Sequence, residues 1–226
     1  MRRFLSPKSL FLMALLPLGG CQLLGIVGIV AKAMPKIVPA AYTGLAGKDV
    51  AVMVWTDRAI SVDWPNMSID VGASIRKKLL AGQADDKPKE LEGTTFPVTP
   101  QSIARFQLDH PEMDNAPITE IAPQVGVHRL IYIEITRFQT RSDMAVNTDL
   151  YLGQIVANIK VVEYENGQAK IGYKENNVTI QFPKKAPADG VSNLGDDKTY
   201  VLTVDAFTTQ AAWRFYKHEE EREVGE

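Results

Sequence analysis

The sequence predicts an α+β domain built on a mixed β-sheet, with packed helices and a long β-hairpin in its C-terminal half. Two strongly apolar runs, 48–55 and 128–138, are typical of strands that are covered on both faces. Two further strand-like runs, 151–164 and 169–181, are joined by an Asn-Gly pair. This pair is a strong hairpin signal, because both turn residues tolerate positive φ. Helical patterns separate the runs, so the predicted order is β-α-β-α-α-β, then a β-hairpin and a final helix.

The first half of this domain is expected to hold one strand, one long helix and several loops. After the first strand we expect a polar loop through Pro65, then a helix over 67–81, where apolar residues recur at a spacing of four. Basic residues in the last turns and the following Gly82 suit a helix C-terminus. A surface loop over 83–93 and a short strand over 94–98 follow.

The second half begins with a helix over 99–108, which has a threonine N-cap and a proline in its first turn. A short helix over 117–125 precedes the second apolar strand. In the hairpin, the Asn-Gly turn places Glu163 opposite Lys170, which is a favourable cross-strand pair. A final helix over 199–219 packs its apolar residues against the sheet.

The start of the chain has the parts of a secretory signal. Basic residues precede an apolar run from Leu10 to Leu18, and small residues follow it. The chain's single cysteine, Cys21, closes the stretch Leu18-Gly19-Gly20-Cys21. This stretch resembles the lipobox of a bacterial lipoprotein. The resemblance implies that residues 1–20 are a signal peptide and that acyl chains such as palmitate anchor the protein to a membrane through Cys21.

Other interpretations of this region stay open. Cys21 could be an incidental small residue, or the uncharged stretch Leu10–Ala31 could be an uncleaved anchor, although its proline and four glycines make it a poor helix. Residues 21–46 are expected to form the lipidated cysteine and a membrane-proximal tether, or else to pack on the domain. Residues 47–226 are expected to form one globular domain. Both anchored interpretations place this domain outside the cytoplasm.

The lipobox, together with the apolar strand 50–55, gives the chain a resemblance to envelope lipoproteins with a domain like the N-terminal domain of TolB. The secretion lipoprotein CsgG and lipoprotein activators of penicillin-binding proteins share this plan, which would cover residues 47–217. The resemblance implies a cell-envelope location, facing the periplasm or the cell exterior. Gln22 after the cysteine favours the outer membrane in familiar lipoprotein sorting. Cys21 is the only functional residue that the resemblance assigns in this sequence.

The charge balance argues against a nucleic-acid partner. The first 21 residues contain three basic and no acidic residues, so 22 basic and 27 acidic residues remain in the rest of the chain. A binder of phosphate backbones would display a basic face instead. We therefore expect a non-enzymatic accessory protein that binds another envelope component. A subunit of a secretion or transport assembly, self-associating through the hairpin, is the second hypothesis, and an enzyme of unknown reaction is the third.

A partner-binding loop is predicted where the first strand ends. Trp55 and Trp64 flank the stretch that contains Asp57, and loops at the carboxyl ends of strands often carry binding residues. A tryptophan that packs over the end of a sheet is the commoner alternative. Tyr132 and Phe138 are expected to be core or sheet-face residues.

No motif predicts a catalytic residue, a metal site or a cofactor. The stretch 44–49 lacks the spacing of a phosphate loop and precedes its strand. The densest group of possible metal ligands is interrupted by a proline and matches neither a zinc nor an EF-hand pattern, so we expect a solvated loop: Asp109, His110, Glu112 and Asp114. His218 is expected at a solvated helix end.

Overall fold

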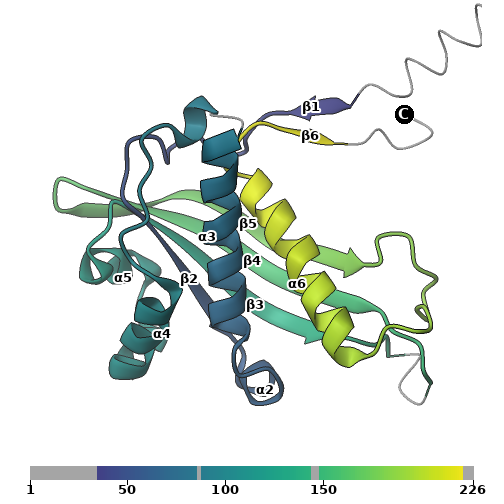
Figure 1. The fold of residues 1–226 in the computed structure, drawn as a ribbon. Coiled ribbons are helices and arrows are strands. Elements are labelled where there is room, and N and C mark those ends of the chain that lie inside the picture. The colour runs from purple at the N-terminus through teal and green to yellow at the C-terminus, as the bar shows by residue number, and fades with distance from the viewer. Residues whose placement is uncertain (1–34, 86–87, 144–147, 221–226) are drawn as a thin grey trace, which may run out of the picture. The chain divides into compact units, whose positions relative to one another are not determined.

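The computed structural model describes residues 35–85, 88–143 and 148–220. It contains a mixed four-stranded sheet with helices, which confirms the predicted α+β class (Figure 1). The main compact unit spans Pro39–His218. Its elements, in chain order, are β2 (Val50–Thr56), α2 (Arg58–Asp63), α3 (Met67–Asp85), η1 (Lys89–Leu91), α4 (Pro100–Asp109), η2 (Pro111–Asn115), α5 (Ile118–Val125), β3 (Arg129–Gln139), β4 (Gly153–Glu165), β5 (Gln168–Phe182) and α6 (Asp196–Trp213).

The sheet has the strand order β2-β3-β4-β5. β2 and β3 run parallel, and the two other pairings are antiparallel. β4 and β5 form the predicted hairpin, and Asn166 and Gly167 both have positive φ, 52° and 78°. Glu163 lies opposite Lys170 as predicted, with 3.2 Å between the Lys170 Nζ and Glu163 Oε2 atoms.

One face of the sheet carries the larger hydrophobic core. Figure 1 shows α3 and α6 side by side across this face. Alternate residues of all four strands point into this core, together with the apolar residues of both helices. Phe207 and Phe215 are its largest fully buried side chains. Because burial of a large apolar side chain is worth about 1.5–3 kcal/mol, this face supplies most of the driving force for folding.

Among the described residues, those on the opposite face are covered only in part. α4 and α5 pack on a second, smaller core that includes Met53, Ile103 and Leu130. Farther along β4, the residues that point to this face are only partly buried, whereas their neighbours in sequence are fully buried. A sheet with antiparallel strands can leave one face in water in this way. We call the uncovered part of this face the open face; its β4 residues are Gln154, Val156, Asn158 and Lys160.

The globular unit begins earlier than the predicted boundary at Gly47. Tyr42 and Leu45 are buried in the larger core, with 8% and 0% of their surface exposed. The backbone amides of Ala41 and Tyr42 donate to the carbonyl of Arg214. Tyr42 and Leu45 therefore pack on the domain. A separate two-stranded sheet pairs β1 (Lys36–Val38) with β6 (His218–Glu220).

Two local predictions in the first half were wrong. The segment expected to be a polar loop before Pro65 contains α2, because the Asp57 carboxylate accepts a hydrogen bond from the Ala59 amide and caps the helix. Gly82 does not end α3, which continues to Asp85. A Cβ atom at Gly82 would lie 3.0 Å from the Tyr216 Cζ atom, so this glycine permits close packing.

Two further expectations also need correction. The stretch 94–98 is not a strand but makes one isolated bridge, between Thr95 and Asp49. The final helix ends at Trp213 rather than at residue 219. Phe215 and Tyr216, which follow the helix, are buried in the larger core.

Candidate functional site

The structure separates the two tryptophans of the predicted partner-binding loop. Trp64 packs with the larger core: its ring stacks on Tyr200 at 4.6 Å between centroids and meets Phe138 edge to face at 5.5 Å. Asp57 caps α2. Trp55 lies at the carboxyl end of β2 and points to the opposite face, beside the smaller core. The structure therefore does not bring these three side chains together, and Trp55 lines a hollow in the described part of the chain.

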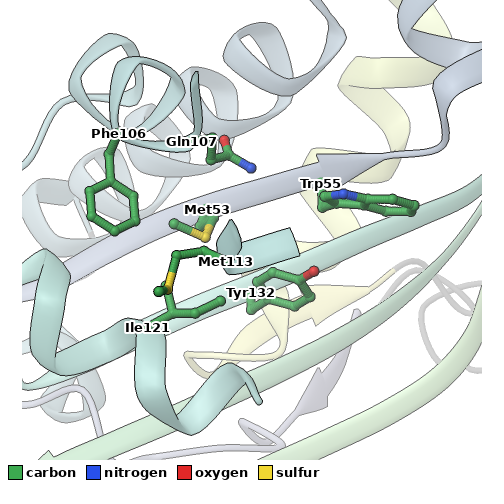
Figure 2. Close-up of a pocket in the computed structure, with 7 residues that line it drawn as sticks. All are labelled: Met53, Trp55, Phe106, Gln107, Met113, Ile121 and Tyr132. Carbon is green, nitrogen blue, oxygen red and sulfur yellow. The ribbon is translucent and has the colours of Figure 1, made fainter. Parts of the chain in front are cut away.

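This hollow lies where the smaller core meets the open face. It encloses about 270 Å³, counting the space that is open to solvent. Figure 2 shows its lining residues, which come from β2, α4, η2, α5 and β3: Met53, Trp55, Phe106, Gln107, Met113, Ile121 and Tyr132. The walls are mostly apolar and aromatic, as is usual for ligand and partner sites. The Gln107 side chain is held in place because its Nε2 atom donates to the Val54 carbonyl over 3.2 Å.

Polar side chains continue from the hollow across the open face. The strand register places Trp55, Glu134 and Asn158 in one row across β2, β3 and β4. The Asn158 Nδ2 atom donates to Glu134 Oε2 over 3.1 Å, and the Lys160 Nζ atom lies 3.6 Å from the same oxygen. These groups are fixed at the surface, because neighbouring strands hold their backbones.

The next row contains two lysines beside an aromatic ring. Tyr132, Lys160 and Lys174 are cross-strand neighbours on β3, β4 and β5. The Lys160 Nζ atom lies 5.7 Å from the centroid of the Tyr132 ring, within the range of a cation–π contact. Tyr132 is a sheet-face residue, as predicted, but the sequence analysis did not connect it to Trp55. The alternation of side chains along the two apolar strands could have shown that Trp55 and Tyr132 can lie on the same face of the sheet.

Several titratable groups with displaced pKa values join elements of the larger core. Burial, reinforced by a hydrogen bond to Glu163, raises the pKa of Tyr42. Burial alone would raise the pKa of Glu163, but hydrogen bonds from Tyr42 and Lys170 lower it below its ordinary value. Burial and a hydrogen bond to Glu175 likewise raise the pKa of Tyr173.

A buried arginine side chain lies at the end of the sheet nearest the hairpin turn. Arg129 is 5% exposed and donates to the carbonyls of Gly44 and His128 and to Glu165. The Lys48 ammonium donates to the same carboxylate over 2.7 Å. Hydrogen bonds from Lys48 and Arg129 lower the pKa of Glu165 to about 2. This cluster ties the residues before β2 to β3 and to the hairpin.

The group of possible metal ligands stays a surface feature. The His110 Nδ1 atom lies 3.0 Å from Glu112 Oε1, and Asp109 forms an ion pair with Arg105. Within the described part of the chain, no three His, Cys, Asp or Glu side chains are placed to hold a metal ion. His218 lies in β6 rather than at a helix end, and its ring stacks on Trp213 at 4.5 Å.

The lipidation site predicted at Cys21 lies outside the described residues, as does Asp114's side chain. Over residues 35–85, 88–143 and 148–220, no helix is both long enough and apolar enough to cross a membrane.

Solved structures that resemble the chain include a lipoprotein. This is GNA1162 from Neisseria meningitidis, at 14% identity and a TM-score of 0.40 over 73% of this chain and 97% of that one. A PelC dodecamer from Paraburkholderia phytofirmans is 10% identical, with a TM-score of 0.41 over 81% of this chain and 98% of that one. The hypothetical protein CT253 from Chlamydia trachomatis is 15% identical, with a TM-score of 0.41 over 74% and 92%.

No family model matches the chain, and no curated protein matches it. The likeness to a TolB-type or CsgG-type domain, which was stated from the sequence, therefore stays a prediction.

Proposed function

We propose that this protein is a lipid-anchored, non-enzymatic accessory protein of the bacterial cell envelope, which acts by binding another envelope component at its open face. The observation that carries the binding role is the hollow beside Trp55 and Tyr132, which continues into a row of fixed polar groups. Aromatic side chains surrounded by polar groups are typical of surfaces that bind partners.

Anchoring is supported by the sequence around Cys21. A basic start, an apolar run and small residues before the cysteine fit a lipoprotein signal. One acyl chain gives marginal membrane binding, but two or three hold a protein durably, because each buried methylene adds about 0.8 kcal/mol. The binding domain would then face the periplasm or the cell exterior.

The non-enzymatic assignment is supported by the structural contacts of the groups whose pKa values are shifted. Perturbed pKa values are a common mark of active sites, but structural ion-pair networks also produce them. In this domain Tyr42, Glu163 and Glu165 connect the residues before β2 to the hairpin. Tyr200 donates to Asp70 and so connects α6 to α3. These contacts give each of the four groups a structural role.

Photo-crosslinking in living cells tests the proposed binding face. A photoreactive phenylalanine analogue would replace Val156, which is partly exposed on the open face. The matched control replaces Val201, which is 60% exposed on α6 and so lies on the other side of the sheet. We expect one discrete crosslinked envelope component from position 156 and none from position 201. Equal crosslinking from both positions, or none from either, would show that the proposed face is wrong.

A second candidate is a subunit of an envelope secretion or transport assembly. The observation that favours it is the edge strand β5, which is 15 residues long and leaves Ile171 47% exposed. An exposed edge strand can pair with another chain. Light scattering on the purified full chain in detergent tests this candidate: a concentration-independent oligomer that Ile171→Lys disperses supports it, and a strict monomer argues against it.

A further inference from the structure

We propose that the open face binds an extended acidic segment of a partner protein, with an apolar side chain in the hollow and a carboxylate between Lys160 and Lys174. This inference rests on the proposed function and names the chemistry of the partner. Three features of the face carry it: an unfavourable pair of like charges, an apolar hollow beside that pair, and the spacing between the two.

The two lysines form an unfavourable pair in the free protein. Lys160 and Lys174 lie directly opposite each other on β4 and β5 and point to the same face. Like charges at such positions destabilise a sheet. Lys160 is compensated by Glu134 and by the Tyr132 ring, but Lys174 is exposed and forms no ion pair with any carboxylate of the described residues. A carboxylate placed between the two ammonium groups would relieve the repulsion.

The apolar part of the partner would occupy the hollow. Trp55 and Tyr132 are partly exposed there, and Met53 forms the floor with only 2% of its surface exposed. An apolar side chain placed against these rings would gain apolar contact. A buried aromatic or aliphatic anchor of this kind usually dominates the affinity of a protein interface.

The spacing of the two features fits a peptide in extended conformation. From Tyr132 on β3 to Lys174 on β5 there are two strand intervals, which is about 10 Å at about 4.8 Å for each interval. An extended chain advances about 3.3 Å per residue. The apolar residue and the acidic residue of the partner are therefore expected two or three positions apart.

A peptide fits this face better than an anionic lipid does. The row beside the lysines holds Asn158 and Glu134, and the Asn158 side-chain amide can donate to and accept from peptide groups. The hollow is small and partly open to solvent, so it offers no channel for an acyl chain. Charge complementarity with a flat, polar face is the usual way in which such contacts gain specificity.

Binding of synthetic copolymers to the full mature chain in detergent tests the inference. The probes are a random copolymer of glutamate and tyrosine, polyglutamate alone, and a copolymer of lysine and tyrosine. The test variant is Lys174→Glu, and the matched control is Lys198→Glu, which makes the same charge change at an exposed position on α6. Both lysines are exposed, so we expect both variants to fold, which circular dichroism would verify.

We expect the glutamate–tyrosine copolymer to bind the wild type more tightly than polyglutamate does, and the lysine–tyrosine copolymer not to bind. Lys174→Glu should weaken binding about tenfold or more, because it replaces an attraction with a repulsion, while Lys198→Glu should change it less than about twofold. Trp55→Ala should remove the advantage of the copolymer over polyglutamate. Equal affinity for the wild type and Lys174→Glu would overturn the inference.

Other occupants would give different results. If vesicles of phosphatidylglycerol bind through Lys174 and the copolymer does not, the face recognises lipid and the inference is wrong. If the protein self-associates and Lys174→Glu alone disperses it, the occupant is a second copy, and the inference is again wrong. Discrete crosslinking from position 156 in cells, together with no binding of the acidic copolymer, would retain the proposed function and reject only this partner chemistry.

Discussion

Replacement of Arg129 tests how the chain before β2 is held to the sheet. Arg129 is 5% exposed, and its guanidinium donates to the Gly44 carbonyl over 2.9 Å, to the His128 carbonyl over 2.8 Å and to Glu165 over 2.7 Å. Arg129→Met keeps most of the aliphatic stem but removes all three donors. The substitution therefore isolates the polar contribution from the packing contribution.

The expected cost follows from what each partner loses. The His128 carbonyl keeps the hydrogen bond that it accepts from the Tyr164 amide, so its loss is small. The Glu165 side chain is 45% exposed and can be hydrated. The Gly44 carbonyl loses a charged donor, and such hydrogen bonds are worth about 1.5–3 kcal/mol. With the smaller losses added, Arg129→Met should lower the free energy of unfolding by about 2–4 kcal/mol.

Urea unfolding followed by tryptophan fluorescence measures this change. Arg137→Met is the matched control, because Arg137 is an arginine of the same strand whose side chain is 50% exposed and paired with Asp143. A surface ion pair of this kind contributes about 0–1 kcal/mol. A loss of less than about 1 kcal/mol for Arg129→Met, or equal losses for both variants, would refute the argument that the buried guanidinium holds these segments together.

Three further outcomes follow from single positions. Cys21→Ser should leave the fold unchanged and abolish incorporation of a clickable fatty acid; an intact wild-type chain that keeps residue 1 and carries no acyl mass would end the lipoprotein interpretation. Gly153→Ala should destabilise the protein by about 1–3 kcal/mol in thermal unfolding, because its Cβ would clash with the Thr203 hydroxyl of α6; an unchanged melting temperature would contradict this packing. Hydrogen bonds from Lys48 and Arg129 lower the pKa of Glu165 from 4.5 to about 2, so its contribution to stability is present above pH 4.5 and lost as the pH falls toward 2. Glu165→Gln should flatten this part of the pH dependence, and an unaltered slope would show that the carboxylate is not responsible.

The hairpin shows where sequence patterns were sufficient. The Asn-Gly turn and the alternation on either side of it depend on neighbouring residues only, so the register of Glu163 against Lys170 was predicted correctly. The threonine N-cap before α4 was predicted for the same reason. α2 was missed although Asp57 is a good capping residue, because six residues are too few to show a helical period.

The candidate site shows where sequence patterns were not sufficient. Trp55 and Trp64 are close in sequence, and their grouping into one loop site followed from that closeness. α2 separates them, and Trp64 finds Tyr200 and Phe138 on the other side of the sheet. The residues that line the hollow with Trp55 come mostly from α4, η2, α5 and β3, about 50 to 80 residues later in the chain.

The sequence by itself determined the α+β class, the hairpin and the lipoprotein-like start, because these depend on periodicity, turn chemistry and residues that are adjacent in the chain. Only the tertiary structure decided that residues 39–46 belong to the domain and that one face of the sheet is partly uncovered. It also decided that Tyr132, Lys160 and Lys174 lie in one row across the sheet. Strand pairing and helix coverage bring distant residues together, and side chains alternate between faces at every residue. The membership of a surface site is therefore settled by packing rather than by local sequence.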